Sequence, residues 1–227
     1  QNDHIDDLLQ RGVDGIIIDP ACGFPETYQQ LESSGIPHVM VFHTAPPLSG
    51  PLVCVNNIWG GYLATRYFIE RLGIAPFHLP GPEDNQESDE RKAGFRKAIE
   101  EAGITYQPEL MVYPSPTVSW DQGKAAIHDL ADRNRLPRAI FAVNDYVALG
   151  ALRAAHERGI KVPEELAVIG FDDLNLASWQ AGVQLSTIRQ PKQAIGELAM
   201  RMLYEQMAGG KVHNEQLEPE LVLREST

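Results

Sequence analysis

Residues 139–173 read AIFAVNDYVALGALRAAHERGIKVPEELAVIGFDD, and this stretch decides the fold class. Two short apolar runs, at 139–143 and 167–170, flank a segment long enough for a helix. Continuous apolar runs of this length are typical of strands that are buried on both faces of a parallel sheet. The stretch therefore predicts a strand, a crossover helix and a second, parallel strand.

Polar residues follow both of these predicted strands. Asn144 comes directly after the first strand, and Asp172 and Asp173 come after the second. In an open parallel sheet the ligand crevice lies beyond the carboxyl ends of the strands. We therefore expect Asn144 and Asp172 to lie side by side in a ligand-binding α/β protein.

The alternation of strands and helices continues in both directions along the chain. We expect further strands at 13–18, 38–42, 52–55, 77–79, 185–188 and 220–224, and helices at 5–11, 26–33, 60–72, 90–102, 120–134, 147–158 and 195–207. Segments at 44–51, 189–191 and 218–219 indicate chain crossings. They divide the chain into one subdomain of residues 1–55 plus 190–217 and another of residues 56–189 plus 218–227.

Three helices carry further predictions. Arg91 is expected in the first turn of the helix at 90–102, where a cation opposes the helix dipole, which suggests an anionic or hydroxyl partner. Ser119 and Gln122 fit a capping box, so Trp120 would begin a helix at the rim of the crevice. The helix at 147–158 is apolar around most of its circumference, which predicts that a second chain covers part of it.

Composition limits the classes of function. With 43% apolar residues, the 227-residue chain can bury a substantial core, and its net charge of −12 argues that any contact with DNA comes from elsewhere. Cys22 and Cys54 lack metal-ligand spacing and are interpreted as buried thiols. No signal peptide, membrane-spanning run, P-loop, dinucleotide fingerprint, H-E-x-x-H or G-x-S-x-G occurs, so we expect a cytoplasmic, non-enzymatic protein without a cofactor or metal.

A series of short motifs gives the chain a family resemblance over nearly its whole length. The motifs are VDGII (13–17), GIP (35–37), GGYLAT (60–65), GP (81–82), RKAGF (91–95), AVND (142–145), ALGA (148–151), VIGFDD (168–173), TIRQP (187–191) and the ending 221–227. In this order they resemble the effector-binding core of the lactose/galactose repressor (LacI/GalR) family of bacterial transcription regulators.

The resemblance implies an architecture and a set of partners. It implies two flavodoxin-like, periplasmic-binding-protein-like subdomains with parallel sheets and three chain crossings, a small effector bound between them, and a homodimer. It also implies an N-terminal helix-turn-helix that binds operator DNA. That segment is not in this sequence. Because the sequence starts with the end of a helix, at 5–11, we expect the first strand-helix unit of the family to be missing as well.

The resemblance further assigns residues to a ligand site and to a dimer interface. The effector contacts that it implies fall on Arg91, Asp172, Asn144, Asp19, Asn85, Glu87, Trp120, Tyr146 and Phe171. The dimer positions fall on Leu149 and Trp179. Several of these have an ordinary structural reading as well: Asn144 as a helix cap, Asp19 as part of an Asp-Pro turn, Arg91 as a surface ion pair and Trp120 as a packed rim residue.

The charge of this set bears on the effector. Asp19, Glu87 and Asp172 around one Arg91 would repel a phosphate and suit the hydroxyls of a neutral mono- or disaccharide. A purine or nucleoside that stacks on Phe171, Tyr146 or Trp120 is the alternative within the family. A periplasmic sugar-binding protein of a transporter and a sugar-modifying enzyme are the rivals outside it. We expect Arg91→Ala or Asp172→Ala to abolish the effector response and to leave the fold and dimer intact.

Overall fold

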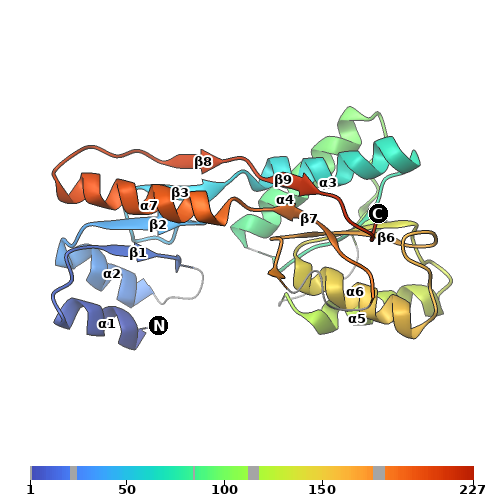
Figure 1. Ribbon diagram of the computed structural model, residues 1–227, viewed down its shortest axis with the longest axis horizontal. Coiled ribbons are helices and arrows are strands. Elements are labelled where there is room, and N and C mark those ends of the chain that lie inside the picture. Colours follow the sequence, from blue (N-terminus) through green and yellow to red (C-terminus); the bar gives the residue numbers. More distant parts are fainter. Residues whose placement is uncertain (1, 21–24, 84, 112–117, 176–181) are drawn as a thin grey trace. The chain divides into compact units, whose positions relative to one another are not determined.

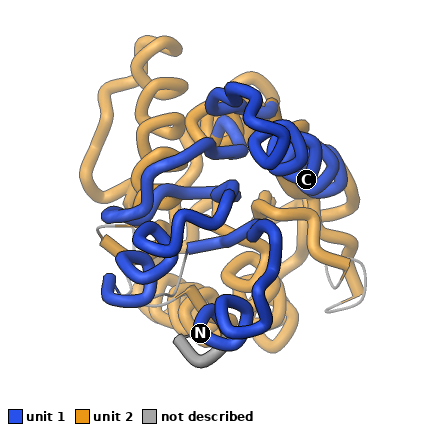
Figure 2. Tube along the Cα trace, turned by 90° about the vertical axis from the view of Figure 1, so that its left-hand side faces the viewer, with its two compact units in different colours: residues 1–56, 191–217 blue, residues 57–190, 218–227 orange. Residues whose placement is uncertain are grey.

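The chain divides into two compact units. The computed structural model describes residues 2–20, 25–83, 85–111, 118–175 and 182–227. Unit 1 consists of residues 1–56 and 191–217, and unit 2 of residues 57–190 and 218–227 (Figure 2). The subdomain bounds expected from the sequence lie within one residue of these, but the segment expected to carry the first crossing, 44–51, ends five residues before unit 1 reaches its first boundary at residue 56.

Unit 1 is a parallel sheet with helices on both faces. It contains α1 (Asn2–Gln10), β1 (Ile16–Ile18), α2 (Pro25–Ser34), β2 (His38–Val41), β3 (Leu52–Val55), α7 (Lys192–Met207) and β8 (Glu215–Leu217). The strand order is β1-β2-β3-β8, and all neighbours are parallel. Helix α7 covers one face, and α1 and α2 cover the other (Figure 1). Strand β8 was not predicted, because its residues are largely exposed and form no apolar run.

Unit 2 has the same layered plan with a larger sheet. It contains α3 (Asn57–Leu72), β4 (Phe77–Leu79), α4 (Gln86–Glu101), a 3-10 turn η2 (Pro108–Leu110), α5 (Trp120–Asp132), β5 (Ala139–Ala142), α6 (Asp145–Glu157), β6 (Ala167–Phe171), β7 (Ser186–Arg189) and β9 (Glu220–Val222). The strand order is β4-β5-β6-β7-β9, with β9 antiparallel to β7. Helices α3 and α4 lie on one face, and α5 and α6 on the other (Figure 1).

The strand-helix-strand unit predicted from residues 139–173 is confirmed. Strands β5 and β6 are parallel neighbours, with Ile140 opposite Val168, and every residue of both strands is buried. Their carboxyl ends, which precede Asn144 and Asp172, therefore lie at the same edge of the sheet.

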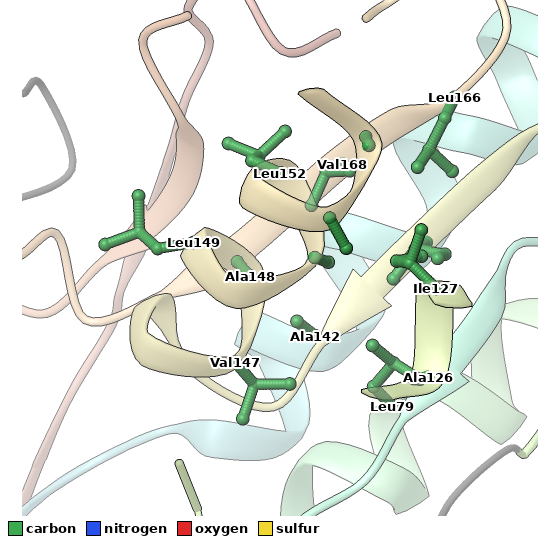
Figure 3. Close-up of a cluster of buried hydrophobic side chains, with 14 of the residues drawn as sticks. Leu79, Ala126, Ile127, Ala142, Val147, Ala148, Leu149, Leu152, Leu166 and Val168 are labelled. Atoms are coloured by element: carbon green, nitrogen blue, oxygen red, sulfur yellow. The ribbon is translucent and has the colours of Figure 1, made fainter. Parts of the chain in front are cut away.

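Helix α6 packs differently from the expectation. On one side the helix lies close against α5, since a Cβ at Gly150 would collide with the backbone oxygen of Trp120. Leu149 and Leu152 point away from Ala126 and Ile127 of α5 in the close-up of the cluster (Figure 3). They are nevertheless only 1% and 2% exposed in a single chain. The chain itself therefore buries the apolar surface of α6, so the composition of this helix does not require a second chain, and the homodimer stays a prediction.

The start of α4 also differs from the expectation. The helix begins at Gln86 rather than at residue 90, because the Asn85 side chain caps it by accepting a hydrogen bond from the Ser88 N–H at 2.9 Å. Arg91 consequently lies in the second turn, so the argument that it opposes the helix dipole from the first turn is wrong. The predicted cap of α5 is confirmed: the Gln122 N–H donates to Ser119 Oγ at 3.3 Å.

Candidate ligand-binding site

Arg91 is a buried cation at the carboxyl edge of the unit 2 sheet. The residue is 4% exposed. Its Nε donates to Asn57 Oδ1 at 3.0 Å, and its Nη1 donates to the backbone oxygen of Val143 at 2.8 Å. Two elements, the start of α3 and the end of β5, therefore fix the plane of the guanidinium.

Phe171, the last residue of β6, supports the same guanidinium. The Arg91 Cζ lies 3.7 Å from the centroid of the Phe171 ring, within the range of a cation–π contact. The ring is fully buried. A Cβ built at Gly60 would lie 2.5 Å from Phe171 Cε2, so α3 can approach the ring this closely only with glycine at that position. The Phe171 ring therefore packs against both the guanidinium of Arg91 and helix α3.

The remaining nitrogen of Arg91 faces two carboxylates. Nη2 lies 3.7 Å from Glu87 Oε1 and 3.7 Å from Asp172 Oδ1. Both distances allow ionic attraction and are longer than a hydrogen bond. Side-chain exposures of 25% for Glu87 and 18% for Asp172 show that the cluster is accessible from one side.

Asp172 has an unusual backbone conformation. Its φ is 110° and that of Asp173 is 49°, in the left-handed region that costs a non-glycine residue free energy. The Asp172 N–H donates to the Ile188 oxygen at 2.8 Å. Its Oδ1 accepts a hydrogen bond from Gln190 Nε2 at 2.5 Å. The side chain is thus held at a set position beyond the strand end.

Asp173 is neutralised by arginines instead of facing Arg91. Arg189 Nε donates to its Oδ2 at 2.6 Å, and Arg224 Nη2 donates to its Oδ1 at 2.5 Å. Burial alone would raise the pKa of the Asp173 carboxyl, but these two hydrogen bonds outweigh it and lower the pKa. Asp173 is therefore a structural carboxylate next to the partly buried carboxylate of Asp172.

Asn144 caps α6. Its Oδ1 accepts a hydrogen bond from the Val147 N–H at 3.0 Å, and the residue is 8% exposed. The capping bond uses only the amide oxygen, so the amide nitrogen is the part of Asn144 that a ligand could contact. The residue precedes α6 directly after Val143, whose oxygen binds Arg91.

Among the described residues, some buried side-chain atoms of unit 2 lack a hydrogen-bond partner, and two of them lie beside the cluster. These two atoms are Ser88 Oγ, on α4, and Gln190 Oε1, after β7. Buried polar atoms are almost always satisfied by protein, water or ligand. Both residues neighbour the Arg91–Asp172 cluster, since Ser88 lies one turn before Arg91 and Gln190 binds Asp172. The cluster therefore has room for additional polar contacts.

The other residues expected in the ligand site are distributed as follows. Asn85 is exposed, and its side chain caps α4. Trp120 is partly buried against the core of α5 and α6, and Tyr146 is 45% exposed. Asp19 belongs to unit 1, where its Oδ1 lies 3.3 Å from His43 Nε2. Trp179, expected at a dimer interface, lies outside the described residues. The structure thus brings together Arg91, Asp172 and Glu87, with Phe171 and Asn144 beside them.

Sequence reasoning missed Asn57 and Gln190. Asn57 accepts from Arg91 and donates to Glu90 Oε2 at 3.0 Å, and Gln190 orients Asp172. Each is a single polar residue at the start of a helix or after a strand, where polar residues are common. What distinguishes them is their burial, with 2% exposure for Asn57 and 8% for Gln190. Burial of a single polar residue cannot be recognised from the sequence.

A cavity of about 560 Å³ lies elsewhere, in unit 1. It is lined by residues that precede β3 and β8, including Pro51 and Asn214, and so opens at the amino ends of these strands. Ligands of open parallel sheets bind at the carboxyl ends. By this rule the Arg91 cluster, at the carboxyl edge, is the candidate ligand site, and this cavity is not.

Neither metal sites nor membrane-spanning helices are found among the described residues. Across residues 2–20, 25–83, 85–111, 118–175 and 182–227, no three His, Cys, Asp or Glu side chains are grouped so as to hold a metal ion. Over the same part of the chain, no helix combines the length and apolarity needed to cross a bilayer.

The sequence is similar to a family of binding domains and to transcription regulators. Residues 66–227 match the family described as periplasmic binding protein-like domain. The transcriptional regulator DegA of Bacillus subtilis is 35% identical over 97% of this chain and 66% of its own length. The transcriptional repressor PurR of Vibrio atlanticus is 31% identical over 99% of this chain and 67% of its own length. The chain thus spans about two thirds of these relatives.

The fold is also similar to the solved structure of a transcription regulator. The complex of the transcriptional regulator CelR with cellobiose superposes with a TM-score of 0.85 at 30% identity, over 99% of this chain and 69% of the other. Both the sequence relatives and this structure are named as transcription regulators.

Proposed function

The chain belongs to the lactose/galactose repressor family of bacterial transcription regulators, and from that membership we propose that it is the ligand-sensing core of such a regulator. In this proposal a small effector binds at the Arg91–Asp172 cluster and changes the affinity of the whole protein for operator DNA. An N-terminal helix-turn-helix outside this sequence would bind the DNA, and the regulator would act in the cytoplasm as a homodimer. Binding, and not catalysis, is its role.

One observation carries the proposal for the ligand: the 3.7 Å separation of Arg91 Nη2 from Asp172 Oδ1. A sugar hydroxyl accepts one hydrogen bond and donates another. A hydroxyl at this position would accept from the guanidinium and donate to the carboxylate, and so bridge the two groups. The guanidinium is held in place beforehand, which reduces the ordering cost of binding.

The charge of the cluster favours a neutral ligand. Arg91 faces Glu87 and Asp172 at equal distances, so two negative charges outweigh one positive charge. A phosphate would be attracted by Arg91, but both carboxylates would repel it. We propose a neutral mono- or disaccharide, and the cellobiose bound to the similar regulator CelR makes cellobiose the first compound to test.

The competing functions have less support. A purine would need an aromatic surface, but Arg91 covers one face of the buried Phe171 ring, and Trp120 packs against the α5–α6 core. Of the three aromatic residues considered for stacking, this leaves Tyr146, which is 45% exposed. The exposed Tyr146 and the similarity to the repressor PurR keep a purine in the test. The relatives named above are transcription regulators, which favours a regulator over a transporter's binding protein.

A ligand screen by thermal shift tests the proposal. The panel contains cellobiose, glucose, galactose and ribose as neutral sugars, hypoxanthine and guanine as purines, and glucose 6-phosphate as a charged sugar. A ligand that binds only the folded state stabilises it, and Tm rises with the logarithm of the ligand concentration once that concentration exceeds Kd. We expect a neutral sugar to raise Tm, and a shift produced by purines or by glucose 6-phosphate alone would overturn the saccharide assignment.

A further inference from the structure

Asp145 is a carboxylate buried beneath the candidate site. It is the first residue of α6 and is 0% exposed. A Cβ at Gly170 would collide with Asp145 Oδ1, so β6 passes directly against this carboxylate. A buried acid is costly unless hydrogen bonds satisfy it, and the chemistry of its neighbours therefore indicates what it does.

The two oxygens of Asp145 bind groups that control the loop after β6. Oδ2 accepts the Leu174 N–H at 2.8 Å, and Oδ1 accepts the Thr187 hydroxyl at 2.6 Å. Thr187 Oγ1 in turn accepts the Asp173 N–H at 3.3 Å. Directly or through Thr187, Asp145 thus holds the two backbone amides that follow Asp172.

The loop needs such support because its backbone is strained. Asp172 and Asp173 both have positive φ values, 110° and 49°. Strained residues persist only where the surrounding contacts fix them. We infer that Asp145 is a positioning residue, which fixes the loop 172–174 so that the Asp172 carboxylate faces Arg91. The inference rests on the proposed function, because it gives Asp145 its role through the ligand contact of Asp172.

The protonation of Asp145 fits this role. Burial raises the pKa of its carboxyl to about 7; hydrogen bonds from Thr187 and Leu174 lower it, and the charges of Asp172 and Asp173 raise it further. The charged groups beyond these two are the arginines that bind Asp173, Arg189 and Arg224. In the protonated state Oδ2 still accepts from Leu174, while Oδ1–H donates to Thr187, so the loop remains held in both states.

Amide exchange of the ligand-free chain tests the inference by NMR. Asp145→Ala removes both acceptors, while Asp145→Asn keeps an acceptor for the Leu174 N–H and a donor toward Thr187 Oγ1. The reference amide is Val143, which donates to the Leu79 oxygen at 2.9 Å in the same sheet. Dividing the exchange rates of Leu174 and Asp173 by that of Val143 corrects for any general loss of stability.

The expected pattern is specific. In Asp145→Ala the exchange of Leu174 and Asp173 relative to Val143 rises by roughly tenfold or more, as expected for loss of a hydrogen bond to a buried carboxylate. In Asp145→Asn the ratio stays near that of wild type. Unchanged ratios in Asp145→Ala, or equal increases in the Ala and Asn variants, would overturn the positioning role.

A second variant keeps the test decisive if Asp145→Ala does not fold. Thr187→Val preserves the shape of the side chain and removes the hydroxyl that binds the Asp173 amide. A faster relative exchange of Asp173 would support the inference, and an unchanged one would overturn it. Calorimetry with cellobiose and glucose is run in parallel: failure of the wild type to bind either sugar would count against the saccharide function, and the exchange ratios would still decide the role of Asp145.

Discussion

Arg91 Nη2 and Asp172 Oδ1 lie 3.7 Å apart at the carboxyl edge of one sheet, each fixed by contacts of its own. Asn57 and Val143 bind the guanidinium, and Gln190 binds the carboxylate. A pair that is held close without a hydrogen bond of its own is suited to a ligand hydroxyl that bridges it. Substitutions at this pair and in the surrounding core, with matched controls, test how unit 2 is built.

Arg91→Lys tests the planar guanidinium. Lysine keeps the charge but not the fork that reaches Asn57 and Val143 together. We expect roughly tenfold or greater loss of saccharide affinity by calorimetry and a loss of about 1–3 kcal/mol in the free energy of unfolding, since a buried acceptor is left unpaired. The expectation that Arg91→Ala leaves the fold intact therefore needs correction, because Arg91 is only 4% exposed.

Arg133→Lys is the matched control for that change. The Arg133 side chain is 63% exposed and pairs with Asp129 on the surface of unit 2. We expect its stability to stay within about 0.5 kcal/mol of wild type and its affinity to be unchanged. Equal effects of the two Arg→Lys changes would show that Arg91 has no special role.

Gly60→Ala tests the close approach of α3 to Phe171. The added methyl would lie 2.5 Å from Phe171 Cε2, so the ring that packs against Arg91 would have to shift. We expect a loss of about 1–3 kcal/mol in stability from overpacking, together with weaker ligand binding. Denaturant unfolding and calorimetry measure the two effects.

Gly196→Ala is the control for Gly60→Ala. Gly196 also lies within a helix, α7, but a Cβ there would meet nothing within 4 Å. We expect a gain in stability of up to about 1 kcal/mol from helix propensity. A comparable loss in both variants would contradict the packing argument.

Leu149→Ala separates a core residue from an interface residue. Leu149 is 1% exposed within one chain, so truncation should leave a cavity and cost about 2–5 kcal/mol. The loss should be the same at low and high protein concentration in denaturant unfolding. Leu223→Ala, at a residue 52% exposed, should change stability little. A loss that depends on protein concentration would restore Leu149 to a dimer interface.

Asp145→Asn tests the buried acid through pH. The pKa of Asp145 is raised from 3.8 to about 7 in the folded chain. Between these values the unfolded chain loses the proton and the folded chain keeps it, so wild-type stability falls as pH rises, by at most about 1.4 kcal/mol per pH unit. The asparagine variant lacks this dependence. Its stability relative to wild type should increase from pH 4 to pH 7 and then level off; a difference that does not vary with pH would contradict the shift.

The sequence was sufficient to predict the parallel strand-helix-strand unit at 139–173, because fully buried strands have a clear apolar signature. It was insufficient for α6, since a helix that its own chain buries on several sides has the same composition as one that a second chain covers. The positive φ of Asp172 was also hidden, because that backbone usually takes glycine. Asn57 and Gln190 were missed because their importance comes from tertiary contacts with Arg91 and Asp172.

The central claim is that the Asp172 carboxylate binds a hydroxyl of a neutral saccharide together with Arg91. Titration calorimetry of wild type and Asp172→Asn, with the neutral sugar that raises Tm most, tests it most directly. Because the amide keeps the size of the side chain and removes its charge, we expect affinity to fall by roughly tenfold or more while Tm without ligand changes little. An unchanged Kd in Asp172→Asn would contradict the claim.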